Sequence, residues 1–359
     1  MKKLRILFVW ALISLLLQFG VYALLNYQIE KVMKPIAASN QPATSQVKVT
    51  IPSTGLRNVQ ISYGKDYLAY MDKGTLQIYN IKKKKVVFVS PSANDQNLGV
   101  LTYQWLPDRN TLVYLYADKK SSYDSQTTDL YSLELPSSSE DTPPDNRLNQ
   151  TIRFPAGGKV EELVVSTSTN LMYFTVKNES TEQLMQIDVN KNVRTLNKWG
   201  ETIDNMVASD LHGTLYIDSK VGSTRTIIAF DAGKRKLISR NNYDRILAIK
   251  AGKVYIGEVK NNELVKIKTI TDRSNLADDP ALKTEWEGTI PFNNARALVD
   301  AKGQIIVYDN QTAYVVTGGQ LKDVKLTGEQ NYVSDDGAEI MQLSIQGTST
   351  MVELRPLNP

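Results

Sequence analysis

The chain has 359 residues and a formal net charge of +4, so its length allows one large all-β domain and its charge is mild. It contains no cysteine and one histidine, which excludes disulfides, thiol catalysis and thiolate metal sites. Basic and aromatic residues do not interleave as they do in nucleic-acid-binding proteins, so we expect no nucleic-acid partner and no bound cofactor.

The N-terminal segment predicts a membrane anchor. Lys2, Lys3 and Arg5 precede an apolar run from Ile6 to Leu25 that only Gln18 interrupts. A run of roughly 20 residues can cross a bilayer, and the basic residues before it favour the cytoplasmic side. The predicted divisions are a cytoplasmic segment (1–5), a transmembrane signal anchor (6–27), a flexible spacer (28–45) and an extracytoplasmic domain (46–359).

A cleaved signal peptide is the alternative for this segment. Its apolar region is normally about 7–15 residues long and ends at a small-x-small site. The nearest small pair is Ala37-Ala38, and the bulky Ile36 precedes it. Under both interpretations, the folded body of the chain is exported from the cytoplasm. We predict a single-pass protein of the cell membrane with a cytoplasmic N-terminus.

The body begins with an antiparallel meander. Tyr67–Tyr70, Leu76–Ile81 and Val86–Val89 are strand-like runs separated by turn residues at Asp72–Gly74 and Lys82–Lys85. Similar pairs of strands recur along the chain at a spacing of roughly 36–55 residues, which is typical of four-stranded β-propeller blades. The later pairs begin near Leu112, Leu171, Thr214, Lys253, Ile305 and Ile340.

Two turns carry a family resemblance. Trp105, Pro107 and Asp108, followed by the apolar run Thr111–Tyr114, are similar to the W-S-P-D-G turn that opens propeller blades. Ser334–Gly337, which includes Asp336 and Gly337, matches the same element without its proline. The chain therefore resembles a degenerate β-propeller of the TolB or WD40-like kind, and these residues are expected to be structural.

The resemblance implies an all-β fold, a single β-propeller of about seven blades, with six or eight left open. An elongated sandwich array or two smaller β domains remain alternatives. Gln46–Ile51 is a free strand that could complete the last blade and close the ring. Pro136–Asn149 and Thr271–Thr284 interrupt the strand pattern and are expected to be solvated loops, the first with some mobility.

Residues for catalysis or metal binding are sparse. His212 lies in a predicted turn, and no G-x-S-x-G element accompanies it. Asp278-Asp279 and Asp335-Asp336 lack the spaced ligands of a calcium loop and are expected to be turns. We therefore predict no catalytic and no metal-binding residues, while paired carboxylates for glycoside chemistry stay open. The candidates are Glu161-Glu162, Asp108 and Glu285.

Two tryptophans are candidates for partner or ligand binding. Trp199 and Trp286 each lie near Glu and Gly, and either could be a platform for a sugar ring or a peptide, or could pack in the core. The resemblance implies binding of other proteins or peptides on one face of the ring. We expect a non-enzymatic scaffold for an envelope or membrane protein, held by the N-terminal helix.

The alternative function is a propeller that binds or cleaves glycans of the cell wall or other extracellular polysaccharides. It predicts an acidic, aromatic-lined pocket at the centre of the ring. A third hypothesis is a receptor that signals through a partner helix in the membrane, because the cytoplasmic segment would hold only about five residues.

Overall fold

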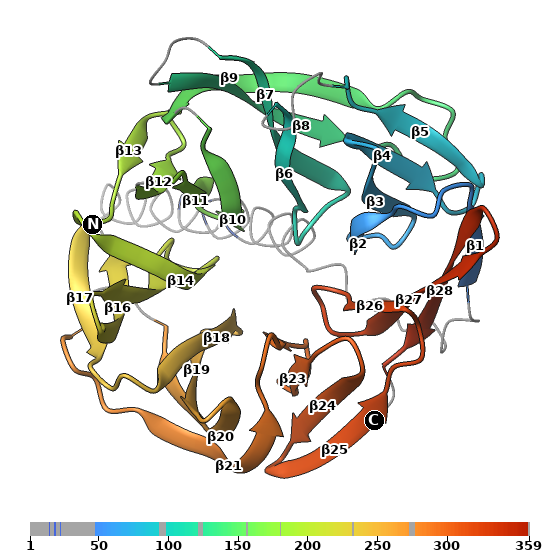
Figure 1. Cartoon of the computed structure of the whole chain (residues 1–359). Coiled ribbons are helices and arrows are strands. Elements are labelled where there is room, and N and C mark those ends of the chain that lie inside the picture. Colours follow the sequence, from blue (N-terminus) through green and yellow to red (C-terminus); the bar gives the residue numbers. More distant parts are fainter. Residues whose placement is uncertain are drawn as a thin grey trace, which may run out of the picture. The chain divides into compact units, whose positions relative to one another are not determined.

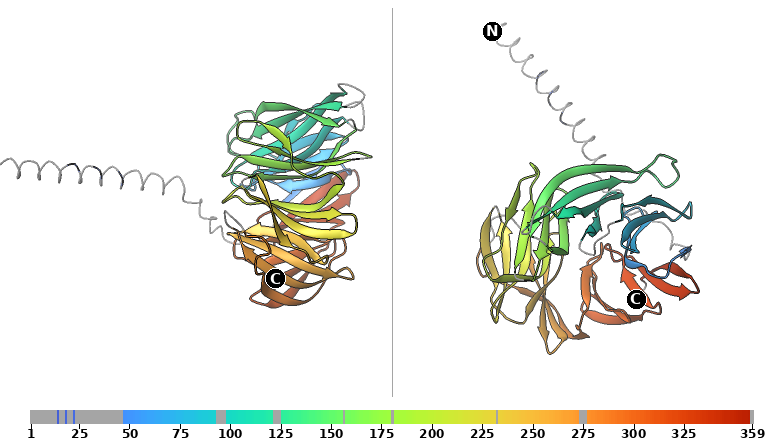
Figure 2. Two further views of the ribbon diagram at one scale, coloured as in Figure 1. Left: turned by 90° about the vertical axis from the view of Figure 1, so that its left-hand side faces the viewer. Right: turned by 45° about the horizontal axis from the view of Figure 1, so that its top comes forward.

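The computed structural model describes residues 47–92, 98–120, 125–155, 157–179, 181–231, 233–272 and 277–357, together with three single residues. Twenty-eight strands in these ranges form seven antiparallel four-stranded sheets. The sheets stand side by side around one axis and close into a ring (Figures 1 and 2). The all-β class, the single propeller and the count of seven blades are thereby confirmed.

The chain divides into two compact units, Met1–Ser45 and Gln46–Pro359. The predicted anchor and spacer lie outside the described residues, except for Ser14, Gln18 and Tyr22, which are helical and exposed. In the part of the chain that the structure describes, no helix has the length and apolarity to span a bilayer. The anchor and the spacer stay predictions.

Six sheets are continuous in sequence, with the first strand of each nearest the axis of the ring (Figure 1). The first sheet contains β2 (Arg57–Ile61), β3 (Tyr67–Asp72), β4 (Thr75–Asn80) and β5 (Lys85–Val89). The second contains β6 (Gly99–Trp105), β7 (Thr111–Lys120), β8 (Ser125–Glu134) and β9 (Asp145–Pro155). The third sheet contains β10 (Lys159–Ser166), β11 (Leu171–Lys177), β12 (Glu182–Ile187) and β13 (Val193–Thr195). The fourth contains β14 (Glu201–Ala208), β15 (Leu215–Val221), β16 (Thr224–Asp231) and β17 (Lys234–Ser239). The fifth sheet contains β18 (Asp244–Lys250), β19 (Lys253–Lys260), β20 (Glu263–Thr271) and β21 (Lys283–Pro291). The sixth contains β22 (Arg296–Val299), β23 (Ile305–Tyr308), β24 (Thr312–Thr317) and β25 (Gln320–Lys325).

The seventh sheet joins the two ends of the ring. It contains β26 (Gln330–Val333), β27 (Glu339–Gln346), β28 (Ser349–Pro356) and, as its outermost strand, β1 (Val47–Ile51). β1 pairs antiparallel with β28 from Val47 opposite Leu354 to Ile51 opposite Thr350. The predicted closure by the first strand of the body is confirmed.

The hydrophobic core lies between neighbouring sheets. One cluster joins Tyr67 and Leu76 of the first sheet with Trp105 and Leu112 of the second. Because each sheet is covered on both faces, its second strand contains a run of consecutive buried residues, as every residue of β23 illustrates. Strands that are buried in this way appear in the sequence as apolar runs, and these runs are the ones from which the blades were predicted.

The signature residues form tight turns between first and second strands. Trp105 ends β6 and is buried, whereas Pro107 and Asp108 lie exposed in the turn that follows. In the last sheet, the carboxylate of Asp336 accepts hydrogen bonds from the Ser334 hydroxyl at 2.6 Å and from the Ala338 amide at 3.1 Å. Gly337 takes a φ of +72° there, a conformation that favours glycine.

The loop predicted over Pro136–Asn149 is partly wrong. Its last five residues belong to β9, an outer strand whose first residues are exposed and therefore polar. Its first residues are docked against the first sheet. The Tyr67 hydroxyl donates to the carbonyl of Pro136 at 2.9 Å, and the Asn80 amide donates to the carbonyl of the buried Ser138 at 3.3 Å.

The second predicted loop, Thr271–Thr284, is also shortened by strands. Thr271 ends β20, and the last two residues lie in β21. Residues 273–276 lie outside the described ranges. After them, the carboxylate of Asp278 accepts a hydrogen bond from the Leu237 amide at 2.9 Å, so this end of the loop is fastened to the neighbouring sheet.

Candidate functional site

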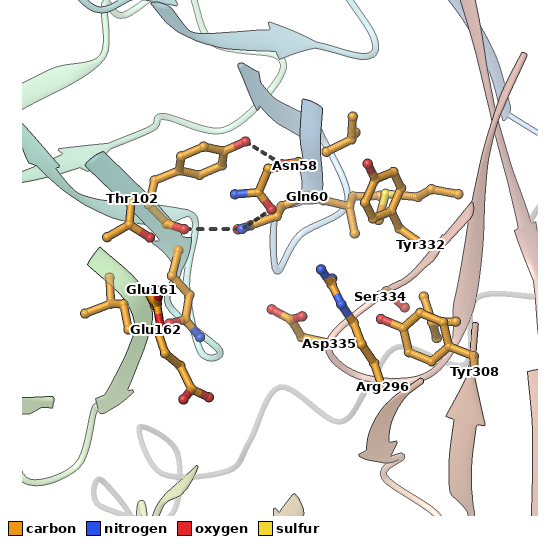
Figure 3. Close-up of a pocket in the computed structure, with 17 residues that line it drawn as sticks. Asn58, Gln60, Thr102, Glu161, Glu162, Arg296, Tyr308, Tyr332, Ser334 and Asp335 are labelled. Atoms are coloured by element: carbon orange, nitrogen blue, oxygen red, sulfur yellow. Dashed lines mark hydrogen bonds between the residues drawn. The ribbon is translucent and has the colours of Figure 1, made fainter. Parts of the chain in front are cut away.

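A cavity of about 280 Å³ lies among the strands nearest the axis of the ring (Figure 3). Its walls come from five of the seven sheets, through β2, β6, β10, β22, β23, β26 and β27 and the turn after β26. We call it the axial cavity. Its polar lining consists of Asn58, Gln60, Thr102, Gln104, Glu161, Glu162, Arg296, Tyr308, Tyr332, Ser334 and Asp335.

A β-bulge brings two successive carboxylates to this cavity. Neighbouring residues of a regular strand point to opposite faces of a sheet. The pairing of β10 with β11 shifts between Val160 and Glu162, and the extra residue redirects the side chains around it. Glu161 and Glu162 therefore both line the axial cavity.

Glu162 is a carboxyl group of the cavity with a strongly raised pKa. Burial raises the pKa of Glu162 to about 8, and a hydrogen bond accepted from the Met206 amide at 3.3 Å opposes that shift only weakly. Among the residues that the structure describes, no cationic side chain forms an ion pair with it. At pH 7 this group is mostly protonated and can donate a hydrogen bond.

Asp335, in the turn after β26, and Arg296, on β22, face the same space (Figure 3). Asp335 is exposed to the water of the cavity, although many protein atoms lie around its carboxyl group. This crowding by protein raises the pKa of Asp335, as does Asp336, while Arg296 and Lys250 act in the opposite direction. Glu161 is also exposed, and it pairs with Lys177 at 3.7 Å.

Tyrosine side chains complete the lining. Tyr308 and Tyr332 reach the cavity from β23 and β26, and burial raises the pKa of Tyr332. The hydroxyl of Tyr103 donates to the carbonyl of Asn58, and the amide of Gln60 donates back to the carbonyl of Tyr103 at 3.2 Å. These bonds fix β2 against β6, so this wall of the cavity is preformed.

Trp199 lies at a second hollow, on the turn between β13 and β14. Its indole is 94% exposed. The hollow has a volume of about 450 Å³ and is bounded by the β11–β12 hairpin, the end of β13 and the start of β14. Binding by Trp199 stays a prediction, and the side chain is accessible for it.

Trp286, the other predicted binding residue, is buried. It lies in β21, is 5% exposed and packs in a core cluster with Ile267 and Ile290. Its indole also lies against Gly288, where an added Cβ would collide with the ring. Trp286 as a surface platform is therefore wrong, and the alternative of core packing holds.

The remaining sequence candidates lie apart from both hollows. Asp108 is exposed and bonds to its neighbour Arg109, and Glu285 accepts a hydrogen bond from Thr269 at 3.0 Å on the outer strand β21. His212 is exposed in the turn before β15, and its main-chain amide bonds to the Ser209 hydroxyl at 3.0 Å. No group of three metal-ligating side chains gathers anywhere in the described ranges.

Sequence reasoning found only part of the axial cavity. In the sequence, Glu161-Glu162 are candidate carboxylates for glycoside chemistry, and Asp335-Asp336 is a candidate for calcium or magnesium binding that is expected to be a turn. Arg296, Tyr308 and the amides of β2 and β6 were missed, because they lie on three other sheets and no local motif connects them.

Comparisons with known proteins agree with the architecture. No family model and no curated protein sequence matches the chain. Its structure is similar to the β-propeller domain of Cps50 (Swd1) from Myceliophteria thermophila, with 14% identity, a TM-score of 0.54, and coverage of 87% of this chain and 98% of that one. It is also similar to a streptogramin B lyase, with 11% identity, a TM-score of 0.53, and coverage of 87% and 97%.

TolB from Acinetobacter baumannii matches with 12% identity over 92% of this chain and 69% of its own, at a TM-score of 0.41. The chain is a seven-bladed β-propeller. At these identities the likeness concerns the fold alone, and one of the similar propellers bears the name of an enzyme.

Proposed function

We propose that this propeller is a non-enzymatic, protein-binding scaffold, tethered to the membrane by its N-terminal segment and acting outside the cytoplasm. The process that it serves would be one of the cell envelope, such as assembly, secretion or polysaccharide synthesis. The anchor prediction supports the location, and the axial cavity supports the binding role.

The observation that carries the proposal is a polar cavity built by five sheets at once. No single blade could form it, and closure of the ring fixes all its walls relative to one another. Its volume of about 280 Å³ lies at the lower end of small-molecule pockets, and such a space accommodates one inserted side chain. A partner would cover one face of the ring and place such a side chain in the cavity.

The charges of the cavity favour a basic side chain. Glu162 and Asp335 have raised pKa values, chiefly because the protein around them disfavours their ionised forms, and neither forms an ion pair among the described residues. An inserted lysine or arginine would supply the missing counter-charge. Arg296 would remain beside Asp335, where it limits the site to one additional cation.

A second candidate function has support from the same cavity. The glycan hypothesis predicted an acidic, aromatic-lined pocket at the ring centre, and carboxyl groups and tyrosines do line the axial cavity. Glycoside hydrolysis uses two carboxyl groups that flank the scissile bond. This alternative predicts that polysaccharide, and not protein, is bound at Glu162 and Asp335.

The proposed tether is tested by crosslinking in native membranes followed by purification of the full-length protein. We expect membrane or envelope proteins to be recovered with the full-length chain and lost when residues 1–45 are removed, because the tether sets the local concentration of partners. Equal recovery with both forms would contradict the role of the tether. Recovery of polysaccharide alone, lost when Glu162→Gln and Asp335→Asn are introduced together, would favour the second candidate.

A further inference from the structure

We propose that the hollow beside Trp199 binds a saccharide ring, which stacks on the indole. We call this region the Trp199 surface. It goes beyond the scaffold function and uses no side chain that the axial cavity uses. Its lining consists of Lys177, Asn178, Glu179, Thr181, Glu182, Gln183, Thr195, Asn197, Lys198, Trp199, Gly200, Glu201 and Thr202.

The exposure of Trp199 needs an explanation. Trp105 and Trp286 are 2% and 5% exposed, whereas Trp199 is 94% exposed. An indole has one of the largest apolar areas among side chains, so leaving it in water forfeits the stabilisation that burial gives. Tryptophan is enriched at binding interfaces, because it combines a large apolar ring with a polar N–H group.

The turn that presents Trp199 is rigid on the side of β12. The Asn197 side chain takes the place of a strand residue, because its oxygen accepts from the Leu184 amide at 2.9 Å and its nitrogen donates to the Glu182 carbonyl at 2.8 Å. The Leu196 amide donates to the Leu184 carbonyl at 2.8 Å. The residues before Trp199 are therefore fixed to the third sheet.

The turn is equally fixed on the side of β14. The carboxylate of Glu201 is buried, accepts from the Lys198 amide at 2.8 Å and bonds to Arg235 at 3.0 Å. Gly200 has a φ of +72°, which allows the chain to reverse directly after Trp199. The backbone that carries Trp199 is therefore fixed on both sides, while the indole itself extends into solvent. A fixed backbone lowers the entropic cost of binding at this position.

The chemistry around the indole favours a sugar over an apolar protein segment. A protein-binding hot spot has an apolar, aromatic core. Apart from Trp199, the side chains of this hollow are amides, hydroxyls, carboxylates and ammonium groups. A saccharide ring fits that combination, because its C–H face stacks on an aromatic ring while its hydroxyls bond to polar groups at the edge. Glu179, Gln183 and Thr195 are placed to do so.

The test is a titration of the full-length, detergent-solubilised protein with immobilised oligosaccharides, using chitotriose, cellotriose and mannotriose as probes. We expect at least one probe to bind, and Trp199→Ala to weaken that binding at least roughly tenfold, as loss of one stacking ring does. Trp199→Phe should retain part of the affinity. Tyr243→Ala is the matched control, because it removes another exposed aromatic ring and should leave binding unchanged.

Two results would overturn the saccharide site. One is that none of the probes binds the wild-type protein, and the other is that Trp199→Ala binds as tightly as the wild type. Because Trp199 contributes little buried area, its variants should fold, and an unchanged Tm would establish this. Substitution of Glu162 and Asp335 should leave saccharide binding unaffected, so failure of this site is distinguishable from failure of the cavity.

Discussion

Removal of residues 1–51 is expected to lower the stability of the ring by roughly 4–8 kcal/mol, because it deletes the closing strand β1. The estimate combines burial of two large side chains with the hydrogen bonds of one edge ladder. Val49 and Ile51 are 4% and 2% exposed and pack in one cluster with Leu56 and Val352. Without β1, the edge of β28 would be free to pair with other chains.

The matched control is a form lacking residues 1–46, which loses the same N-terminal segments and retains all of β1. We expect its Tm to equal that of the full-length body, and the Tm of the form lacking 1–51 to be roughly 10 °C lower or more. The second form should also aggregate at lower concentration. Equal Tm values for the two forms would show that β1 does not hold the ring closed.

The second large effect concerns the carboxyl groups of the axial cavity. We expect the double substitution Glu162→Gln and Asp335→Asn to abolish binding of a basic peptide at the cavity, since it removes both carboxyl groups that lack an ion pair. Acetyl-Gly-Gly-Lys-Gly-Gly-amide is a suitable probe, and its Lys→Gln analogue is the matched neutral peptide. Glu285→Gln, on an outer strand, is the matched protein control.

The pH dependence of that binding has a definite sign. The pKa of Glu162 is raised to about 8, so the free protein carries a proton there at pH 6 that a bound cation must displace. Affinity should therefore rise with pH between about 6 and 8, by at most about tenfold per pH unit for one proton, and then level off. Calorimetric titration at several pH values measures this. Affinity that is constant over the range, or that falls with rising pH, would contradict a role for Glu162.

The strand pattern predicted the architecture because the second strand of each blade contains a run of consecutive buried residues. β3 and β23 show this clearly, and the closing strand β1 was recognisable as a free strand before the first blade. The innermost strands were harder to recognise, since one side of each faces the water of the axis. Bulges in them, as at Val160–Glu162, break the alternation on which strand prediction relies.

The candidate site was less predictable, for reasons that particular residues illustrate. Trp199 and Trp286 have similar neighbours in the sequence, but one lies in a turn fixed by Asn197 and the other on the inner face of β21. Arg296 and Tyr308 share the axial cavity with Glu162 only because the ring brings distant sheets together. No local sequence pattern predicts which residues from distant sheets line the same cavity.

The central claim is that the axial cavity holds a side chain of a protein partner. The most direct test replaces Tyr332, which lines the cavity, by benzoyl-phenylalanine in the full-length protein and irradiates native membranes. The account predicts one dominant protein adduct that disappears when Glu162→Gln and Asp335→Asn are introduced together. Adducts that persist unchanged in that variant, or no protein adduct at all, would contradict it.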